Sequence, residues 1–465
     1  MREHLSPEQA VGVDWLIERL GSYLADPPGF GKTRQLLAAC ADARHVTVVC
    51  PAVIRDARVW EREAATIGFD LPMAVMSYHQ LARTQVEPGG ALVFDEAHRL
   101  KSKDVSWAAN AKSGAAKSAR VHLASGTPTP NGYLPEIYAQ MRLINPDVPA
   151  AYWNNKTGDA FIERWFYRGA NEHTEYWVPG TLLACMREAG CAKHLFEQVG
   201  KPCPCACCAL GGDCVHRDAF WREVVGDYML RRPEEMLDLP DLAGFDDPLL
   251  TPMTAVQRKA YNQLKRDLIA EIPDEGVSLE ALTDSQAFVN LMQMTTGLSS
   301  VGLEPDASLD KHSSKAAMLE ELLPDRSHPT VLGVYFRNSA AAMGRLCERL
   351  GLRYALFGAA TPNKDKVVEA FQRGDVDVLV ASIMVAREGI TLTAADQVAL
   401  VERSWVPGDN EQMVRRVRRR GQTKSVTARQ LLAPNSVDEG QWGALHDKTR
   451  SINTVMRKSE IAKML

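Results

Sequence analysis

Hydrophobic and polar positions follow the same rhythm in two separate parts of the chain. In the first 150 residues, helical patterns alternate with apolar runs typical of buried strands; the clearest are helices at 7–20 and 59–68 and strands at 45–51 and 90–98. Apolar runs return after residue 325, at 330–336, 376–382 and 397–402. Strands that alternate with crossover helices build parallel sheets. The pattern therefore predicts an α/β protein with two similar lobes.

Between these parts lies a stretch with a different pattern. Residues 253–272 favour a helix, whereas Gly, Pro and Cys break any periodicity between 179 and 214. At 465 residues the chain is also too long for one hydrophobic core. We therefore predict three parts: a first lobe at 1–146, an inter-lobe segment at 147–308 with a Cys-rich insertion at about 170–222 and a helical linker, and a second lobe at 309–465.

Composition narrows the class of protein. Hydrophobic residues make up 45% and charged residues 24%, as in globular domains. No apolar run approaches the roughly 20 residues of a membrane helix, and the N-terminus lacks a signal-peptide pattern. We therefore expect a cytoplasmic protein. Because no accessory module accompanies the lobes, we expect its source to be a bacterium or a virus-infected cell. A net charge of -4 argues against coating nucleic acid wholesale, although 415–424 is a local basic run.

The stretch ADPPGFGKTRQ, residues 25–35, has the pattern of a phosphate-binding loop between a strand and a helix. Gly29 and Gly31 leave room for backbone N–H groups around phosphates, Lys32 would reach the outer phosphates, and Thr33 could ligate Mg²⁺. Asp26 stands where that pattern has its first glycine. The alternative is an ordinary glycine turn before a helix with a surface lysine.

Two further motifs follow apolar strands. In ALVFDEAHR, at 91–99, Asp95 could hold Mg²⁺ and Glu96 could polarise an attacking water, because carboxyl ends of strands line the ligand edge of an α/β sheet. In LASGTPTPN, at 123–131, Ser125 and Thr127 could sense the phosphate state by hydrogen bonding. Each alone could be a solvated turn; an acid pair downstream of GKT favours a nucleotide site.

In this order the motifs resemble those of superfamily 2 helicases, specifically the Swi/Snf-like ATPases, whose members also carry Asp at the position of Asp26. The resemblance implies that Asp26 belongs to the residues that bind ATP or Mg²⁺. By the same resemblance Gln9 corresponds to the family's adenine-recognising glutamine. Residues 354–426 are similar to the family's closing block, and MLRRPEEMLDLP at 229–240 resembles its segment linking the lobes. SIMVAREGIT and WVPG are closest in wording to the HARP-type annealing-helicase branch. The resemblance implies two RecA-like lobes around a central cleft that binds ATP and Mg²⁺.

The closing block implies a second set of site residues. Gln412 would bind ATP, and Arg416 and Arg419 would be arginine fingers acting with Lys32 and Glu96 in catalysis, since an arginine across a cleft stabilises the charge of a transferred phosphoryl group. The resemblance also implies that Gly389 couples DNA contact to hydrolysis. Two departures are the stiff Pro27–Pro28 pair and Arg387–Glu388, where many members have Gly and an apolar residue.

The resemblance implies a DNA grip through phosphates, which suits movement independent of base sequence. The implied contacts are Arg55, Ser77, Tyr78, Arg337, Ser382 and Thr391, each of which could instead be an ordinary loop or cap residue. The expected function is an ATP-dependent double-stranded DNA translocase that remodels or reanneals DNA or displaces bound proteins. The alternatives are a strand-separating DNA or RNA helicase and a nucleotide-gated DNA-binding scaffold.

Seven of the ten cysteines lie between 185 and 214, which in a reducing compartment favours a metal over disulfides. Structural zinc takes four thiolate or imidazole ligands, and the candidates are Cys191, Cys203, Cys205, Cys208 and Cys214. One or two zinc ions fit the count; free thiols are the alternative, and an iron–sulfur cluster is less favoured. We expect a monomer that binds duplex or branched DNA and, as further partners, replication, recombination or transcription proteins.

Overall fold

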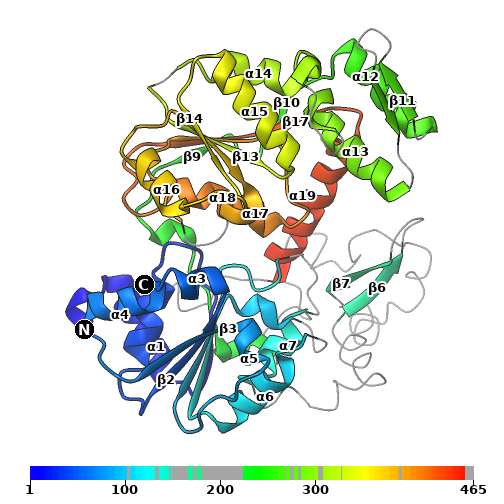
Figure 1. Cartoon of the computed structure of the whole chain (residues 1–465). Helices are drawn as coiled ribbons and strands as arrows, with labels where there is room; N and C mark the ends of the chain where they lie inside the picture. Colours follow the sequence, from blue (N-terminus) through cyan, green and yellow to red (C-terminus); the bar gives the residue numbers. More distant parts are fainter. Residues whose placement is uncertain are drawn as a thin grey trace. The chain divides into compact units, whose positions relative to one another are not determined.

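The computed structural model describes residues 1–101, 105–130, 136–145, 148, 166–170, 175–179, 224–267, 269–272, 277–280, 284–301, 307–325, 327–386 and 390–455. The chain divides into two compact units (Figure 1). Unit 1 comprises Met1–Leu237 with Lys448–Leu465, and unit 2 comprises Asp238–Asp447. Within the described ranges, no helix combines the length and the apolar character needed to cross a membrane.

The described part of unit 1 contains one parallel sheet with strand order β3-β2-β4-β5-β1-β8. Its strands are β1 (Gly21–Leu24), β2 (Val46–Cys50), β3 (Met73–Ser77), β4 (Ala91–Asp95), β5 (Arg120–Ala124) and β8 (Met229–Leu230). Side chains of these strands point alternately into two hydrophobic cores, as parallel sheets covered on both faces require. Phe94, for example, packs in one core and its neighbour Val93 in the other.

Helices cover both faces of this sheet (Figure 1). One face is covered by α1 (Pro7–Ile17), α2 (Lys32–Ala39) and α4 (Val59–Ile67), and the other by α5 (Tyr78–Leu81), α6 (Ala108–Lys117) and α7 (Ile137–Met141). The short helix α3 (Ala52–Asp56) follows β2. Ser6 starts α1 with a capping box, in which its side chain accepts from Gln9 N and the Gln9 side chain accepts from Ser6 N.

The described part of unit 2 contains a second parallel sheet with strand order β10-β17-β16-β13-β15-β14, and β9 also pairs with β17. Its strands are β9 (Leu242–Ala243), β10 (Leu249–Leu250), β13 (Thr330–Val334), β14 (Tyr354–Phe357), β15 (Val378–Ser382), β16 (Gln397–Leu400) and β17 (Val426–Leu432). All of these pairs are parallel. The prediction of two α/β lobes with parallel sheets is confirmed.

The second sheet is also covered on both faces. One face carries α14 (Ser314–Leu322) and α15 (Arg337–Arg349), and the other carries α16 (Lys364–Gln372), α17 (Ile383–Ala386) and α18 (Pro407–Val417). A further core joins α12 (Ala255–Asp267) and α13 (Asp284–Thr296). The helix α19 (Val437–Val455) follows β17.

The segment predicted to lie between the lobes differs from the expected simple linker. β8 completes the first sheet, whereas β9 and β10 join the second, because short parallel pairs satisfy their backbone groups at the sheet edges. The helix expected over 253–272 ends at Asp267, and β11 (Ile269–Ile272) pairs antiparallel with β12 (Val277–Glu280). Isoleucines at both ends of β11 favour a strand over a helix. A second antiparallel pair joins β6 (Phe166–Ala170) and β7 (Glu175–Pro179).

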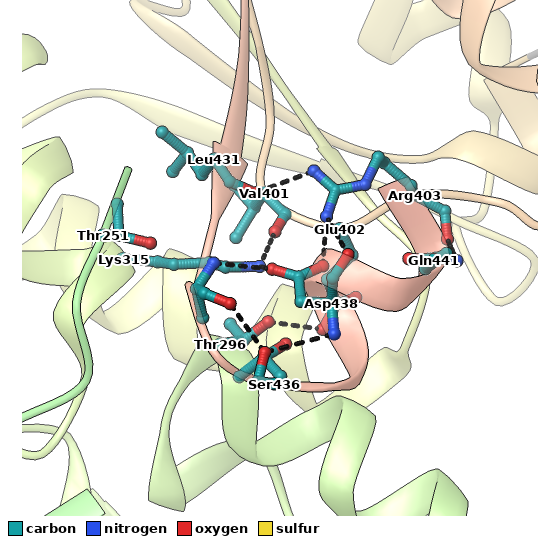
Figure 2. A network of polar contacts seen from close by, with 12 residues as sticks. Thr251, Thr296, Lys315, Val401, Glu402, Arg403, Leu431, Ser436, Asp438 and Gln441 are labelled. Atoms are coloured by element: carbon teal, nitrogen blue, oxygen red, sulfur yellow. Dashed lines mark hydrogen bonds and ion pairs between the residues drawn. The ribbon is translucent and has the colours of Figure 1, made fainter. Parts of the chain in front are cut away.

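Unit 2 contains a buried network of charged residues, shown in Figure 2. The Lys315 ammonium donates to the Val401 carbonyl at 2.7 Å and pairs with Asp438 Oδ2 at 2.9 Å. Arg403 pairs with the same carboxylate and donates to the Leu431 carbonyl at 2.9 Å. Burial lowers the pKa of Lys315; burial would raise that of Asp438, but the two cations keep the Asp438 pKa below its usual range. The network anchors the first turn of α19 to the ends of β16 and β17.

Candidate nucleotide-binding site

The predicted phosphate loop connects β1 to α2 in unit 1. Gly29 and Gly31 have φ of 104° and 69°, in the left-handed region that favours glycine. A Cβ on Gly31 would lie 2.2 Å from Gln9 Nε2, so a side chain there would also displace the Gln9 amide. Because α2 begins at Lys32, the loop presents the N-terminus of an eight-residue helix, whose N–H groups and dipole favour an anion.

Lys32 lies over the loop that precedes it. Its ammonium donates to the main-chain carbonyls of Asp26 at 2.8 Å and Pro27 at 3.2 Å. Its positive charge also acts on Asp95, where it partly offsets the rise in the Asp95 pKa that burial causes. Thr33 follows in the first turn of α2. The lysine and the magnesium-ligand candidates of the two motifs are therefore within electrostatic reach of one another.

Asp95 and Glu96 stand at the carboxyl end of β4. The Asp95 carboxylate accepts from Trp60 Nε1 at 3.2 Å and from Glu96 N at 3.0 Å. Burial and the Glu96 charge raise the pKa of Asp95 to about 6, against the lowering effect of Lys32. Two adjacent carboxylates at a partly buried strand end are a chemically suitable place for a divalent cation, which would restore the ionised form of Asp95.

Glu96 is oriented by the SGTPTPN motif. It has φ of 51°, which is uncommon for a residue with a side chain. Ser125 Oγ donates to Glu96 Oε2 at 3.2 Å, lies 2.9 Å from His98 Nδ1 and accepts from Thr127 N at 3.2 Å. Of the two residues predicted to couple phosphate state to conformation, Ser125 thus contacts the predicted catalytic carboxylate, and Thr127 contacts Ser125. His98 is a further residue of this hydrogen-bonded group, and no sequence motif singled it out separately.

The prediction that the Asp26 side chain binds ATP or Mg²⁺ is corrected by the structure. Its carboxylate is 0% exposed and both oxygens are bound by Arg232, with Nε at 3.2 Å from Oδ1 and 3.1 Å from Oδ2. Gln9, expected to recognise adenine, is buried beside the same loop and donates through Nε2 to the Phe30 carbonyl at 3.1 Å. In the sequence, Arg232 belongs only to the segment that resembles a link between the lobes. Its partner Asp26 is 206 residues away, so no local pattern pairs the two residues.

Three predicted DNA contacts follow strands of unit 1. Arg55 is in α3 and donates to Gln80 Oε1 at 2.5 Å and Ser77 Oγ at 3.3 Å. Ser77 caps α5 and accepts from Gln80 N at 3.2 Å. The prediction for Tyr78 is corrected, because its side chain is 2% exposed and its hydroxyl donates to the Asp95 carbonyl at 2.8 Å. Tyr78 therefore supports β4, the strand that carries the DEAH motif, from inside the lobe.

Four of the second-lobe candidates belong to α18, to the turn after it and to the segment before β16 that contacts both. Gln412 and Arg416 lie on α18, and the Arg416 carbonyl accepts from Leu392 N at 2.8 Å. Arg419 donates to Thr391 Oγ1 at 3.0 Å and to the Ile390 carbonyl at 3.2 Å. A predicted arginine finger therefore contacts a predicted DNA contact directly.

The other two candidates of unit 2, Ser382 and Arg337, lie at the carboxyl ends of strands. Ser382 ends β15, and Arg337 begins α15 after β13. The Glu402 carboxylate holds the turn before Arg337, because it accepts from Tyr335 N at 2.7 Å and Phe336 N at 2.9 Å. This brings the candidates to the edge where ligands bind in α/β sheets.

Some predicted residues lie outside the described ranges. They are Gly389, its neighbours Arg387 and Glu388, and the zinc candidates Cys191, Cys203, Cys205, Cys208 and Cys214. Among the residues that are described, no group of three or more His, Cys, Asp or Glu side chains could hold a metal ion. Cys40, Cys50 and Cys347 are buried free thiols. Burial raises the pKa of each of these three thiols to about 12, which makes them unreactive.

A phosphate loop and a strand-end acid pair on a parallel sheet define a nucleotide-binding α/β protein. Residues 73–297 match the SNF2-related domain and residues 314–421 match the helicase conserved C-terminal domain. The chain therefore belongs to the SNF2-related ATPases of the helicase superfamily. The phosphate loop precedes the first matched range, so the geometry above is what places it in the same unit as the DEAH strand.

Individual relatives are distant. The chain is 23% identical to "SWI/SNF-related matrix-associated actin-dependent regulator of chromatin subfamily A-like protein 1" of Drosophila melanogaster, over 98% of this chain and 56% of the relative. It is 22% identical to "DNA annealing helicase and endonuclease ZRANB3" of Mus musculus, over 97% of this chain and 40% of the relative. Similarity to the solved "Sulfolobus solfataricus SWI2/SNF2 ATPase core in complex with dsDNA" extends over 98% of this chain and 97% of the solved chain, with 18% identity and a TM-score of 0.39. The chain spans about half the length of these curated relatives.

Proposed function

We propose that this chain is an ATP-dependent double-stranded DNA translocase that remodels or reanneals DNA structures or displaces bound proteins. The observation that carries the proposal is the joining of three motifs in unit 1. Lys32 of the phosphate loop acts electrostatically on Asp95, and Ser125 binds Glu96. Membership of the SNF2-related family and similarity to a relative named as a DNA annealing helicase support DNA as the substrate that the energy acts on.

In the proposed reaction, the N–H groups at Gly29 and Gly31 and the N-terminus of α2 bind the phosphates of ATP. Lys32 leaves the loop carbonyls to contact the outer phosphates. Thr33 and Asp95 would hold Mg²⁺, which would supply positive charge against the phosphoryl oxygens. Glu96, oriented by Ser125, accepts a proton from the attacking water.

We also propose catalytic, nucleotide-binding and coupling residues in unit 2. Arg416 and Arg419 stabilise the charge that spreads over the transferred group, an effect worth about 10³ to 10⁵ in rate where an arginine finger is known. Gln412 on the same helix contacts ATP, and Gly389 belongs to the coupling between DNA contact and hydrolysis. Gln9 is proposed to recognise adenine from its place beside the loop.

The proposed DNA grip uses phosphate contacts on both units. The residues are Arg55, Ser77, Arg337, Ser382 and Thr391, and Tyr78 is withdrawn because its side chain is buried. Contacts to phosphates do not distinguish bases, which suits stepwise movement along any duplex. The contact of Arg419 with Thr391 supports a link between this grip and the arginine that assists hydrolysis.

Further proposals concern the setting of the enzyme. We assign at least one structural zinc to the Cys-rich insertion, with ligands among Cys191, Cys203, Cys205, Cys208 and Cys214. We also propose a monomer in the cytoplasm of a bacterium or virus-infected cell, with replication, recombination or transcription proteins as partners. The placement in the HARP-type branch stays a prediction, because relatives of other branches match at similar identity.

ATP turnover tests the proposal. It is measured without nucleic acid and with duplex DNA, single-stranded DNA and RNA, for the wild type, Lys32→Ala, Glu96→Gln and the control Lys117→Ala in α6. We expect duplex DNA to stimulate turnover, both site variants to abolish it, and the control to match the wild type. Turnover that duplex DNA leaves unchanged would refute the translocase.

Movement and metal content are measured separately. A translocase displaces a third strand from a triplex without opening the duplex, whereas opening of a forked duplex would favour a strand-separating helicase. Metal analysis of the wild type and the Cys205→Ser/Cys208→Ser variant tests the zinc; we expect zinc in the first and a loss in the second. A wild-type protein without metal would exclude the zinc site.

A further inference from the structure

The phosphate loop is fastened to a segment far along the chain. β8 runs parallel to β1, and Ala25 N donates to the Leu230 carbonyl at 2.8 Å. The next residue, Arg231, donates through Nη1 to the carbonyls of Ala25 at 2.8 Å and Gly126 at 3.1 Å. Residues 229–237 form the last part of this stretch of unit 1, because unit 2 begins at residue 238.

One side chain of this segment, Arg232, holds both ends of the loop. At the start of the loop, its guanidinium pairs with the Asp26 carboxylate and its main-chain N–H donates to Asp26 Oδ1 at 2.8 Å. At the end, Nη2 donates to Gln35 Oε1 at 2.7 Å, and Gln35 Nε2 donates to the Phe30 carbonyl at 2.8 Å. The guanidinium also lies 4.8 Å from the centre of the Phe30 ring. These residues are fully or almost fully buried.

The same contacts determine where Lys32 lies. Asp26, whose carboxylate Arg232 binds, offers its main-chain carbonyl to Lys32 Nζ at 2.8 Å. A change in the Asp26 backbone that broke its contact with Arg232 would also move that carbonyl. Pro27 and Pro28 have no N–H group, so the loop between its ends lacks two of the backbone donors that could hold it. Contacts from Arg231 and Arg232 therefore add to those of Lys32 in holding the loop.

We propose that Arg232 is a positioning residue for the nucleotide: through Asp26 and Gln35 it keeps the loop in the conformation that receives the phosphates, so that segment 229–237 sets how tightly unit 1 binds ATP. This inference rests on the proposed ATPase function. The competing explanation is an ion pair that only stabilises the fold. The two can be separated because neutralising both members of a buried ion pair often preserves stability, whereas removing one does not.

The decisive variant is Asp26→Asn/Arg232→Met in the full chain. It removes both charges, keeps an oxygen on residue 26 for the main-chain N–H of residue 232, and cuts the link from residue 232 to Gln35. The matched control is Asp42→Asn/Arg120→Met, which removes another ion pair of unit 1, 2.7 Å between Nη1 and Oδ1, at the amino end of β5. Thermal melting, titration with a fluorescent ATP analogue in Mg²⁺ and duplex-stimulated turnover are measured for each.

We expect the double variant to melt within a few degrees of the wild type, and its Kd for the analogue and KM for ATP to rise about tenfold with a smaller change in kcat. The control should retain the wild-type Kd and KM. A double variant that folds and binds the nucleotide like the wild type would overturn the positioning role. The proposed function fails separately, if the wild type itself neither binds the analogue nor hydrolyses ATP.

A second variant serves if the double variant does not fold. Arg232→Lys keeps a positive charge beside Asp26 but has a single nitrogen, which cannot bind Asp26 and Gln35 in the same geometry. We expect it to fold and to raise the Kd of the analogue in the same direction. An unchanged Kd in Arg232→Lys would overturn the inference.

Discussion

Replacement of Asp95 with asparagine should stabilise the protein at neutral pH while it abolishes ATP turnover. Burial and the neighbouring Glu96 raise the pKa of Asp95 from its ordinary 3.8 to about 6. One pKa unit corresponds to about 1.4 kcal/mol, so the ionised carboxylate costs the folded state about 3 kcal/mol at pH 7. Asparagine carries no charge, but its single oxygen serves only one of the two donors, Trp60 Nε1 and Glu96 N. That loss is about 1 kcal/mol, which leaves a gain of about 2 kcal/mol.

The pH dependence identifies the cause of this gain. Because the folded pKa of Asp95 lies above the unfolded one, the folded state holds an extra proton between about pH 4 and pH 6. Wild-type stability therefore falls as pH rises through this window and is level above it, whereas Asp95→Asn lacks this contribution. The variant should gain little at pH 4.5 and its full amount, about 5 °C in melting temperature, at pH 7.

The assay is thermal melting from pH 4.5 to 8 without Mg²⁺, with the exposed carboxylate variant Asp70→Asn as the control. ATP turnover of the same preparations is measured at pH 7.5. The reasoning would be refuted by a variant that is less stable than the wild type at pH 7, or by a difference in stability that stays constant from pH 5 to pH 7.

Three further predictions follow from single contacts. Burial lowers the pKa of His122 to about 4, so the folded state excludes a proton that the unfolded state binds. The free energy of unfolding should therefore fall by up to about 3 kcal/mol as pH drops from 6.5 to 4. Urea unfolding of His122→Gln should lack this pH dependence, and an unchanged pH dependence would contradict the assignment. Lys315→Met should cost about 3 kcal/mol in urea unfolding, because Asp438 loses one of its two buried cations, while the exposed control Lys366→Met should cost nothing measurable. Ser125→Ala should lower kcat about tenfold with little change in the KM for ATP, since it loses a bond to Glu96; a raised KM at wild-type kcat would place Ser125 in binding instead.

The parallel sheets and the order of the motifs were predictable because they depend on local patterns. Strands at 45–51 and 90–98 appear as β2 and β4, and the helices predicted at 7–20 and 59–68 appear as α1 and α4 with small differences at their ends. Glycines that need left-handed φ, at Gly29 and Gly31, were identifiable from spacing alone. The helix predicted over 253–272 failed at its end, because residues 269–272 pair with a strand and sequence periodicity does not include a partner strand.

Side-chain partners were less predictable than elements. Tyr78 follows a strand, like a surface contact, but its ring packs under the DEAH strand. Asp26 belongs to the loop pattern and is therefore predicted to be part of the ATP site, but its carboxylate is buried against Arg232, a residue 206 positions later. No pattern of local hydrophobicity encodes such a pair, because burial of both charges depends on the meeting of β8 with β1.

The sequence by itself determined which residues are candidates for the chemistry, since a phosphate loop, an acid pair after a strand and arginines at regular spacing are local features. It also determined the two-lobe α/β architecture through the alternation of apolar strands and amphipathic helices. Only the tertiary structure decided which of these residues act on one another: Lys32 on Asp95, Ser125 on Glu96, and Arg232 on the loop. The physical reason is that hydrogen bonds and ion pairs require atoms within about 3 Å, and packing alone brings together residues that are distant along the chain.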